Sequence, residues 1–210
     1  MSQLHTLALK LSPELRSKFK EIQELYNAAE AELSRAASVV GDLEFIPVNQ
    51  LRYAGRHLID ALNLTDATQI ELELMQSKGH CKRALFDTYD VLLDFYIQSI
   101  NLILQDYSLI ALDNIIDNEK EIRTFAASAP VAVTRKKASG KKRSEFYKEI
   151  KATLDTAEAY YVQLKASIPE MNKAVDEYNN KIWKNRVLQL FALIGFLGSL
   201  ASIASFVVSR

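Results

Sequence analysis

The sequence contains little glycine, proline or cysteine. Of its 210 residues, six are Gly, four are Pro and one is Cys. Strands and tight turns need frequent Gly and Pro, so their scarcity argues against a β-rich fold and favours long helices. The single cysteine, Cys81, excludes an internal disulfide and a zinc site built on cysteines, and it fits a reducing, cytoplasmic location. We therefore predict an all-α protein.

Familiar catalytic motifs are also missing. The chain has no Gly-rich phosphate loop, no GxSxG elbow and no helix with paired metal-binding histidines. Its three histidines are His5, His57 and His80, of which the last two fall on consecutive helices that would run antiparallel and could approach each other. We expect no metal and no cofactor, and we expect these histidines to pair with buried carboxylates. A non-enzymatic role is favoured.

The net charge is zero, but the charges are unevenly distributed. Residues 1 to 134 carry 12 Lys and Arg against 19 Asp and Glu, whereas residues 135 to 210 carry 14 against 7. A basic segment next to a membrane is attracted by anionic lipid, at about 1 kcal/mol for each nearby basic residue. The C-terminal third is therefore the part expected to face a bilayer.

One long apolar run lies near the C-terminus. Val187 to Ser209 spans 23 residues without a charge, and as a helix it would reach about 34 Å, enough to cross a hydrocarbon core. Basic residues and a tryptophan precede it as an interfacial anchor, and only Arg210 follows. We predict a single-pass, tail-anchored protein of the inner (cytoplasmic) membrane, with its N-terminal domain in the cytoplasm. The anchor residues are Lys181, Trp183, Lys184 and Arg186.

Small residues recur at steps of three or four along this run. Such a face lets two membrane helices approach closely and hydrogen-bond across the contact, although a plain anchor also contains Gly and Ser. Both interpretations stay open, and the first predicts a homo-oligomer. The predicted membrane-helix contact residues are Gly195, Gly198, Ser199, Ser202 and Ser205.

The rest of the chain is predicted to form helices whose apolar residues have coiled-coil-like spacing. Helices are expected at about 13–40, 48–63, 67–104, 109–129, 144–166 and from 168 into the apolar run. In the first helix, apolar residues step by four and three over nearly four heptads. In the third helix, apolar residues cover every face from Val91 to Leu104, as in the central helix of a bundle or one shared with a partner. The seam of the first helix is Leu15, Phe19, Ile22, Tyr26, Ala29, Leu33, Ala36 and Val40.

A basic stretch follows Pro130, where the fourth helix is expected to end. Six like charges within nine residues repel one another and favour disorder until a polyanion binds. A solvated loop needs no function, and contact with anionic lipid is the leading functional alternative. Nucleic acid comes third, because interleaved aromatic side chains for base stacking are missing. The charges are Arg135, Lys136, Lys137, Lys141, Lys142 and Arg143.

These features divide the chain into four segments. We predict an elongated helical bundle in the cytoplasm over residues 1–130 and a basic flexible linker over 131–143. A helical hairpin or stalk over 144–186 and a transmembrane helix over 187–209 complete the division.

Two stretches, Leu51 to Leu62 and Gly79 to Leu93, carry small residues followed by basic, aromatic and carboxylate side chains. Over about residues 48–105 they resemble the paired central helices of HEPN domains, helical bundles that dimerise and often cut RNA. In catalytic members an Arg precedes a His by a few residues, and Arg52 and His57 match that spacing. The resemblance implies that these two would act on the scissile phosphate and the ribose hydroxyl.

The alternative for these residues is structural. The basic side chains would then pair with carboxylates inside or across the bundle, without any chemistry. The basic set is Arg52, Arg56, His57, His80, Lys82 and Arg83, and the acidic set is Asp60, Asp87, Asp90 and Asp94.

Three functional hypotheses follow. The first is a membrane-attached bundle that self-associates or binds a protein partner through its helical faces and acts at the inner membrane. The HEPN resemblance implies, for this hypothesis, a membrane-disrupting effector of a prokaryotic antiviral system. The second is a membrane-tethered ribonuclease using Arg52 and His57, and the third is a passive membrane scaffold or tether.

Overall fold

The computed structural model describes residues 12–42, 44–138 and 143–208, with side chains for 12–42, 44–130 and 147–196. The described part is all-α, as predicted, and contains no strand. It consists of α2 (Pro13–Val40), α3 (Phe45–Asn63), α4 (Ala67–Asp106), the 3-10 turn η1 (Leu112–Asn114), α5 (Glu119–Ala138), α6 (Arg143–Ala166) and α7 (Ile168–Val208).

Local sequence sets both ends of α2. The Ser12 hydroxyl accepts a hydrogen bond from the Leu15 amide at 3.2 Å, and Pro13 follows it at the first helical position. At the other end, Gly41 takes the left-handed conformation with φ of 83° and donates its amide to the Ala37 carbonyl. A residue with a Cβ rarely adopts that φ, so the glycine ends the helix here.

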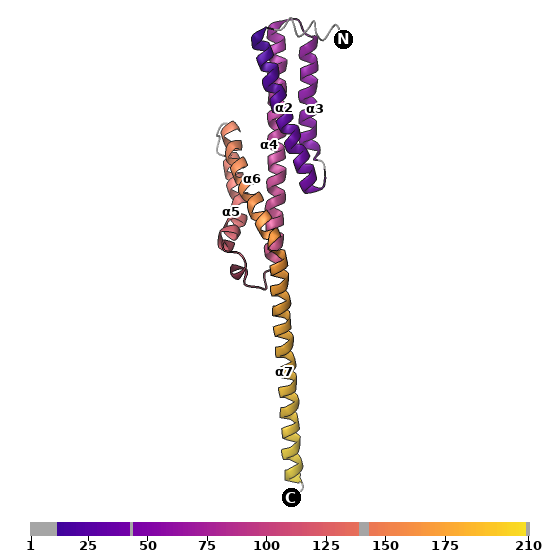
Figure 1. Ribbon diagram of the computed structural model, residues 1–210, viewed down its shortest axis with the longest axis vertical. Helices are drawn as coiled ribbons and strands as arrows, with labels where there is room; N and C mark the ends of the chain where they lie inside the picture. Colours follow the sequence, from indigo (N-terminus) through magenta and orange to yellow (C-terminus); the bar gives the residue numbers. More distant parts are fainter. Residues whose placement is uncertain (1–11, 43, 139–142, 209–210) are drawn as a thin grey trace. The chain divides into compact units, whose positions relative to one another are not determined.

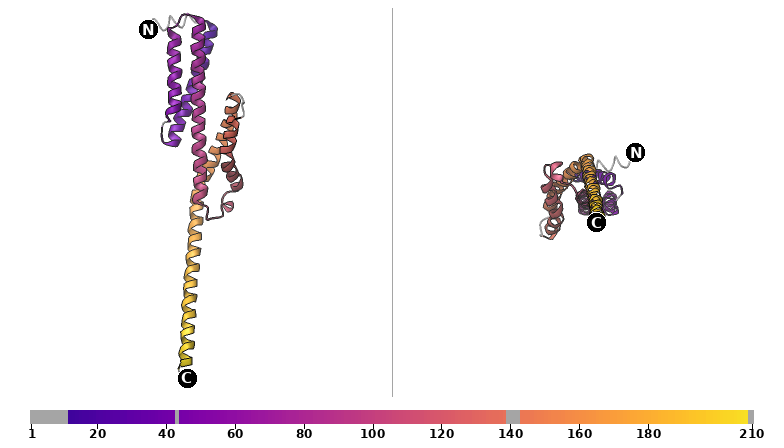
Figure 2. Two further views of the ribbon diagram at one scale, coloured as in Figure 1. Left: turned by 180° about the vertical axis from the view of Figure 1, so that it is seen from behind. Right: turned by 90° about the horizontal axis from the view of Figure 1, so that it is seen from below.

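The helices α2, α3 and the N-terminal part of α4 run side by side, each reversing the direction of the one before (Figures 1 and 2). Every position of the predicted α2 seam is buried or half-buried, which confirms the heptad pattern. Two layers of apolar side chains fill the space between the three helices. One layer joins Leu15, Ile22, Ala54, Ala61, Ile70, Leu74 and Cys81, and the other joins Ala29, Leu33, Leu51 and Ala84.

Polar contacts also hold α2 and α3 against α4. Lys18 and Lys78 bridge α2 and α4 through ion pairs with Glu71 and Glu21, respectively. The hydroxyl of Ser77 on α4 is fully buried and donates to the Ala54 carbonyl on α3 at 2.9 Å. This bond satisfies a hydroxyl that would otherwise be costly to bury.

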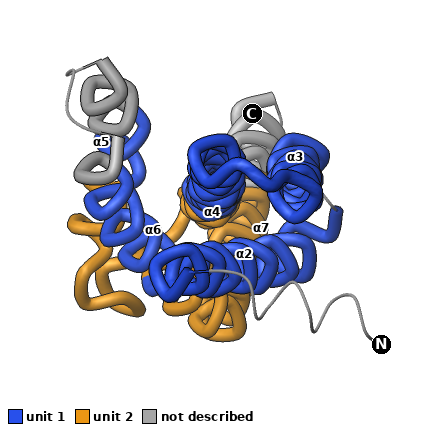
Figure 3. Tube along the Cα trace, turned by 90° about the horizontal axis from the view of Figure 1, so that it is seen from above, with its two compact units in different colours: residues 1–99, 126–159 blue, residues 100–125, 160–210 orange. Residues whose placement is uncertain are grey.

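The chain divides into two compact units, each built from two separate segments (Figure 3). The first unit comprises Met1–Ser99 and Ala126–Ala159. Within it, α6 joins the three-helix core, because the ring of Tyr147 stacks on Phe86 and the guanidinium of Arg35 donates to Glu158 at 3.1 and 3.2 Å.

The second unit comprises Ile100–Phe125 and Tyr160–Arg210. Its buried apolar residues come from the end of α4, from η1 and the turn after it, from the start of α5, from the end of α6 and from the start of α7. Side-chain hydrogen bonds of 2.6 Å from Tyr107 to Asn172 and of 2.7 Å from Gln163 to Asn118 tie these segments together. The buried residues are Ile100, Leu104, Leu112, Ile116, Ile122, Leu164 and Met171.

Two helix boundaries differ from the sequence prediction. The helix expected from about residue 109 is wrong in its first half, because turns and η1 occupy Tyr107 to Asn118 and α5 begins only at Glu119. The predicted end near Pro130 is also wrong, since α5 continues to Ala138 with Pro130 inside it. Proline removes one helical hydrogen bond, but Ala, Lys and Arg after it favour helix. Of the predicted linker, residues 139–142 lie outside the described part.

The final helix agrees with the expected continuous rod. α7 runs for 41 residues without a break from Ile168 to Val208. Across the described residues, no helix has the length and apolar character needed to cross a bilayer.

Candidate functional site

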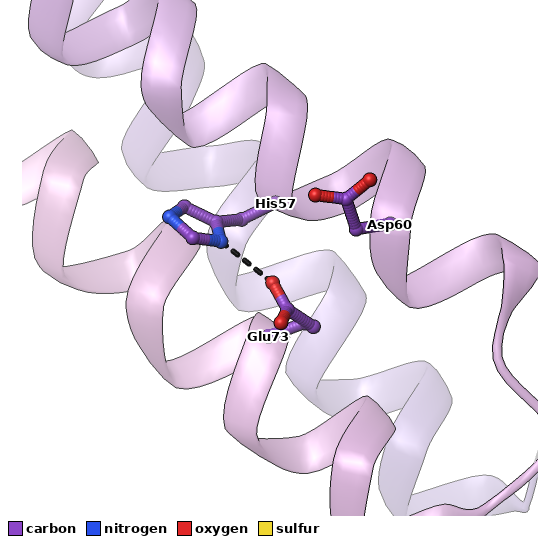
Figure 4. Close-up of side chains that lie close together, drawn as sticks. All are labelled: His57, Asp60 and Glu73. Atoms are coloured by element: carbon purple, nitrogen blue, oxygen red, sulfur yellow. Dashed lines mark hydrogen bonds and ion pairs between the residues drawn. The ribbon is translucent and has the colours of Figure 1, made fainter.

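A polar surface of the first unit lies between α3 and α4 and includes two of the predicted residues, His57 and His80. His57 on α3 is half-buried, and its Nδ1 lies 2.6 Å from Oε2 of Glu73 on α4. Figure 4 shows the imidazole and this carboxylate facing each other across the two helices. The expectation that the histidines pair with buried carboxylates is met only in part, because Glu73 is half-buried and His80 contacts Gln50 instead of a carboxylate.

Asp60 stands one helical turn beyond His57 on α3 (Figure 4). One oxygen of Asp60, one oxygen of Glu73 and a ring nitrogen of His57 all lie within 4.8 Å of one another. Arg56 approaches Asp60 from the solvent side at 3.9 Å, with 76% of its side chain exposed. The cluster therefore brings two carboxylates and one imidazole together at a partly exposed edge.

The ring of His80 lies against that of His57. The two imidazoles are stacked, with centroids 5.2 Å apart and planes 15° from parallel. His80 Nδ1 is 2.7 Å from Oε1 of Gln50, which also accepts a hydrogen bond from Arg83. Burial, the Arg83 charge and His57 lower the pKa of His80, so its ring is neutral at pH 7. A neutral ring can stack on His57 without charge repulsion.

Arg52, the other half of the predicted ribonuclease pair, lies on a different side of α3. Its guanidinium sits 5.0 Å from the centroid of the Tyr53 ring, and its side chain is exposed. A separation of five residues places Arg52 and His57 about 140° apart around a helix. The two predicted residues therefore share a helix but do not converge in the described structure.

The predicted structural pairing is confirmed only in part. Arg56, from the predicted basic set, pairs with Asp60, from the predicted acidic set. Glu73, which binds His57, was absent from the predicted acidic set. A usable signal was present, because residues equally far from the turn of a helical hairpin lie opposite each other. His57 and Glu73 are both eight residues from Thr65, in the turn between α3 and α4.

A second polar cluster joins α2, α4 and α6 within the first unit. Arg35 donates to Glu32 at 2.9 Å and to Glu158 at 3.1 Å, and the ring of Tyr96 is 2% exposed beside them. Burial and the adjacent Glu158 raise the pKa of Tyr96 to about 12. These contacts link α2 to α6 beside a buried tyrosine of α4, so we assign the cluster to stability.

The apolar residues of α7 from Leu188 to Phe196 are exposed, as is Trp183 before them. Seven large apolar side chains of this part are each more than half exposed, and a Cβ added at Gly195 would contact nothing within 4 Å. The predicted interfacial residues Lys181, Trp183, Lys184 and Arg186 are exposed as well. The other predicted contact residues lie outside the part with described side chains: Gly198, Ser199, Ser202 and Ser205.

The predicted polyanion-binding residues fall mostly outside that part too. Arg135, Lys136 and Lys137 belong to α5, and Arg143 is the first residue of α6, but their side chains are not among those described. Lys141 and Lys142 lie outside the described residues altogether. Their binding of lipid or another polyanion stays a prediction.

No family model, curated protein or solved structure matches the chain. The resemblance to HEPN domains stays a prediction. What the protein does is therefore inferred from its own residues and contacts.

Proposed function

We propose that this chain is a membrane-attached helical-bundle protein of the inner membrane, held there by the apolar part of α7 (Ile168–Val208). The exposure of α7 after Arg186 is the observation that carries the proposal. Leu188, Leu190, Phe191, Leu193 and Ile194 fill consecutive turns and are 56–65% exposed. Together with Phe196, which is 61% exposed, they occupy all sides of the helix, so one packed neighbour along one face would not cover them.

The exposed apolar surface of α7 is more stable in contact with lipid or protein than in water. Moving a Leu, Ile or Phe side chain out of water is worth about 1.5–3 kcal/mol, and five such residues in two turns amount to a large driving force. The acyl chains of a lipid bilayer cover a helix on all sides, whereas a protein partner covers one face. Lys181, Lys184 and Arg186, all exposed, precede this surface where anionic headgroups would lie.

The proposed role of the bundle is to self-associate or to bind a protein partner at that membrane. Exposed apolar residues on α3 support an interaction surface there: Phe45 and Ile46 are 73% and 63% exposed, and Ile59 is 62% exposed. Action as a membrane-disrupting effector of a prokaryotic antiviral system rests on the HEPN resemblance of residues 48–105. A passive scaffold or tether is the simpler form of the same membrane attachment.

Membrane attachment is tested by placing a charge in the apolar surface of α7. A lysine at Leu190 or Phe191 costs about 2.5–3.5 kcal/mol near the centre of a membrane helix and less near its ends. We expect wild-type protein to stay in the membrane pellet after alkaline carbonate washing, and the double variant Leu190→Lys, Phe191→Lys to move to the supernatant.

The matched control is Val162→Lys, which places the same charge at an apolar position of α6 that is 58% exposed in the same unit. This variant should pellet like the wild type. Release of the wild-type protein by carbonate would contradict the proposal, as would retention of the double variant.

A ribonuclease is the second candidate, and one observation favours it. Glu73 holds His57 by its Nδ1, as a carboxylate orients the imidazole of a general base. Arg52, on another side of α3, weakens the case. Cleavage of RNA by the purified chain that is lost in Arg52→Ala, His57→Ala would support this candidate, and equal cleavage by that variant would exclude it.

A further inference from the structure

We propose that His57, Asp60 and Glu73 form a binding site for a divalent transition-metal ion, with Zn²⁺ as the best-fitting class. The three residues each offer one ligand atom, and these atoms lie within 4.8 Å of one another. Figure 4 shows the imidazole of His57 and the carboxylate of Glu73 facing each other, with the Asp60 carboxylate beside them on α3. The proposal is independent of membrane attachment.

The donor set decides the kind of ion. One imidazole nitrogen and two carboxylate oxygens suit Zn²⁺ and its neighbours in the first transition row, whereas Ca²⁺ and Mg²⁺ prefer oxygen donors alone. Helical bundles build such sites from a carboxylate and a histidine three residues apart on one helix, together with carboxylates from facing helices. His57 and Asp60 have that spacing on α3, and Glu73 faces them from α4.

The observed distances require a small rearrangement on binding. His57 Nδ1 and Glu73 Oε2 are 2.6 Å apart, whereas two ligands of a tetrahedral zinc ion are about 3.3 Å apart. The two side chains must therefore separate by less than about 1 Å to admit the ion. Nδ1 carries no proton when it binds the ion, so the ring then holds its proton on Nε2 and the hydrogen bond to Glu73 is replaced by bonds to the metal.

The surroundings hold the ligands in place and leave one side open. The stacked ring of His80 restricts rotation of His57, and the Ser77 to Ala54 hydrogen bond fixes α3 against α4 one turn away. The side chains of His57 and Glu73 are 26% and 25% exposed. Three protein ligands and an open edge leave the fourth position to water, as in zinc sites that act on a ligand.

The charge of the site also favours a cation. Two carboxylates line the space, and a divalent ion bound between them balances their charge. The nearest opposing charge is Arg56, whose side chain is 76% exposed at 3.9 Å from Asp60 and can turn into solvent. The competing explanation is a simple His57 to Glu73 ion pair with Asp60 nearby by chance.

The test is a Zn²⁺ titration of the full chain in detergent, without a polyhistidine tag and after removal of metal with a chelator. We expect one Zn²⁺ bound per chain by isothermal titration calorimetry. Asp60→Asn and His57→Gln should each weaken binding by more than about tenfold, as loss of a ligand or its support does.

Glu71→Gln is the matched control, since Glu71 lies two residues from Glu73 on α4 but pairs with Lys18. It should bind Zn²⁺ like the wild type. Circular dichroism confirms that each variant folds, and Asp60→Asn, at a half-exposed position, keeps the test valid if His57→Gln does not fold. Absence of stoichiometric binding would overturn the proposal, and so would equal affinity in Asp60→Asn and the wild type.

Discussion

The apolar residues of α2 and those of the C-terminal part of α7 differ in their exposure to solvent. In α2 the seam residues recur every three or four residues and are all buried or half-buried, and most of them pack in clusters with residues of α3 and α4. In α7 the apolar residues occur on all sides, and those between Leu188 and Phe196 are exposed. A periodic apolar pattern therefore finds its cover within the chain, whereas an apolar run without a period depends on a bilayer or another molecule.

The largest expected effect is the loss of a covered residue in α2. Ile22 is 1% exposed at the centre of the first apolar layer. We expect Ile22→Ala to lower the free energy of unfolding by about 2–5 kcal/mol, because it removes buried methyl groups and leaves a cavity. Denaturant unfolding in detergent, followed by circular dichroism, measures this loss.

Ile59→Ala is the control for that substitution. Ile59 lies on α3 in the same unit but is 62% exposed, so the change should stay within about 0.5 kcal/mol. If Ile22→Ala and Ile59→Ala lowered the free energy of unfolding equally, buried and exposed apolar residues would not differ as we expect.

A smaller effect is expected where the bundle covers a polar group. Burial and Glu158 raise the pKa of Tyr96 to about 12, from an ordinary value near 10. The folded state therefore holds this proton more tightly than the unfolded state. The stability that this gives is fully present below pH 10 and is lost as pH rises from about 10 to about 12. The loss should reach up to about 2 kcal/mol.

The measurement is the free energy of unfolding at pH 9 and at pH 11.5 for the wild type and for Tyr96→Phe. The variant should lose less stability between the two pH values, because it has no phenol to ionise at this position. An identical pH dependence in both proteins would show that the Tyr96 proton is not held by the bundle.

The smallest effect on folding is expected in α7. Leu193 is 56% exposed, so Leu193→Ala removes no packed contact within the chain. We expect a change of less than about 0.5 kcal/mol in the unfolding free energy of the protein in detergent, measured as for Ile22→Ala. A loss approaching that of Ile22→Ala would place Leu193 in a packed core and reverse the comparison.

The sequence was sufficient for those parts of the fold that depend on local signals. Ser12, Pro13 and Gly41 define the ends of α2, and the heptad pattern identified its buried face before any packing was known. The start of α5 was missed because apolar residues from Leu109 to Ile116 continue a helical spacing through turns held by backbone hydrogen bonds. The effect of Pro130 was overestimated, since α5 continues through it to Ala138.

The site was less predictable, because it depends on the register between α3 and α4. Sequence reasoning brought His57 and His80 onto neighbouring helices but proposed Asp60, Asp87, Asp90 and Asp94 as acidic partners. In the structure the partner of His57 is Glu73, because the two residues are equally far from the turn between α3 and α4. Gln50 and His80, and Ala54 and Ser77, also lie opposite each other at nearly equal distances from this turn. Counting outward from the turn would have identified these pairs; the heptad pattern alone does not.

The most direct test of the central claim is the environment of each α7 residue in liposomes. Spin labels at single cysteines placed from residue 188 to 196, in a Cys81→Ala background, report collisions with oxygen, which concentrates in lipid, and with a water-soluble nickel complex. Cover by a bilayer predicts high oxygen and low nickel accessibility on the sides of the helix that face lipid, increasing with depth. High nickel accessibility throughout would mean that water surrounds this surface, and it would contradict the account.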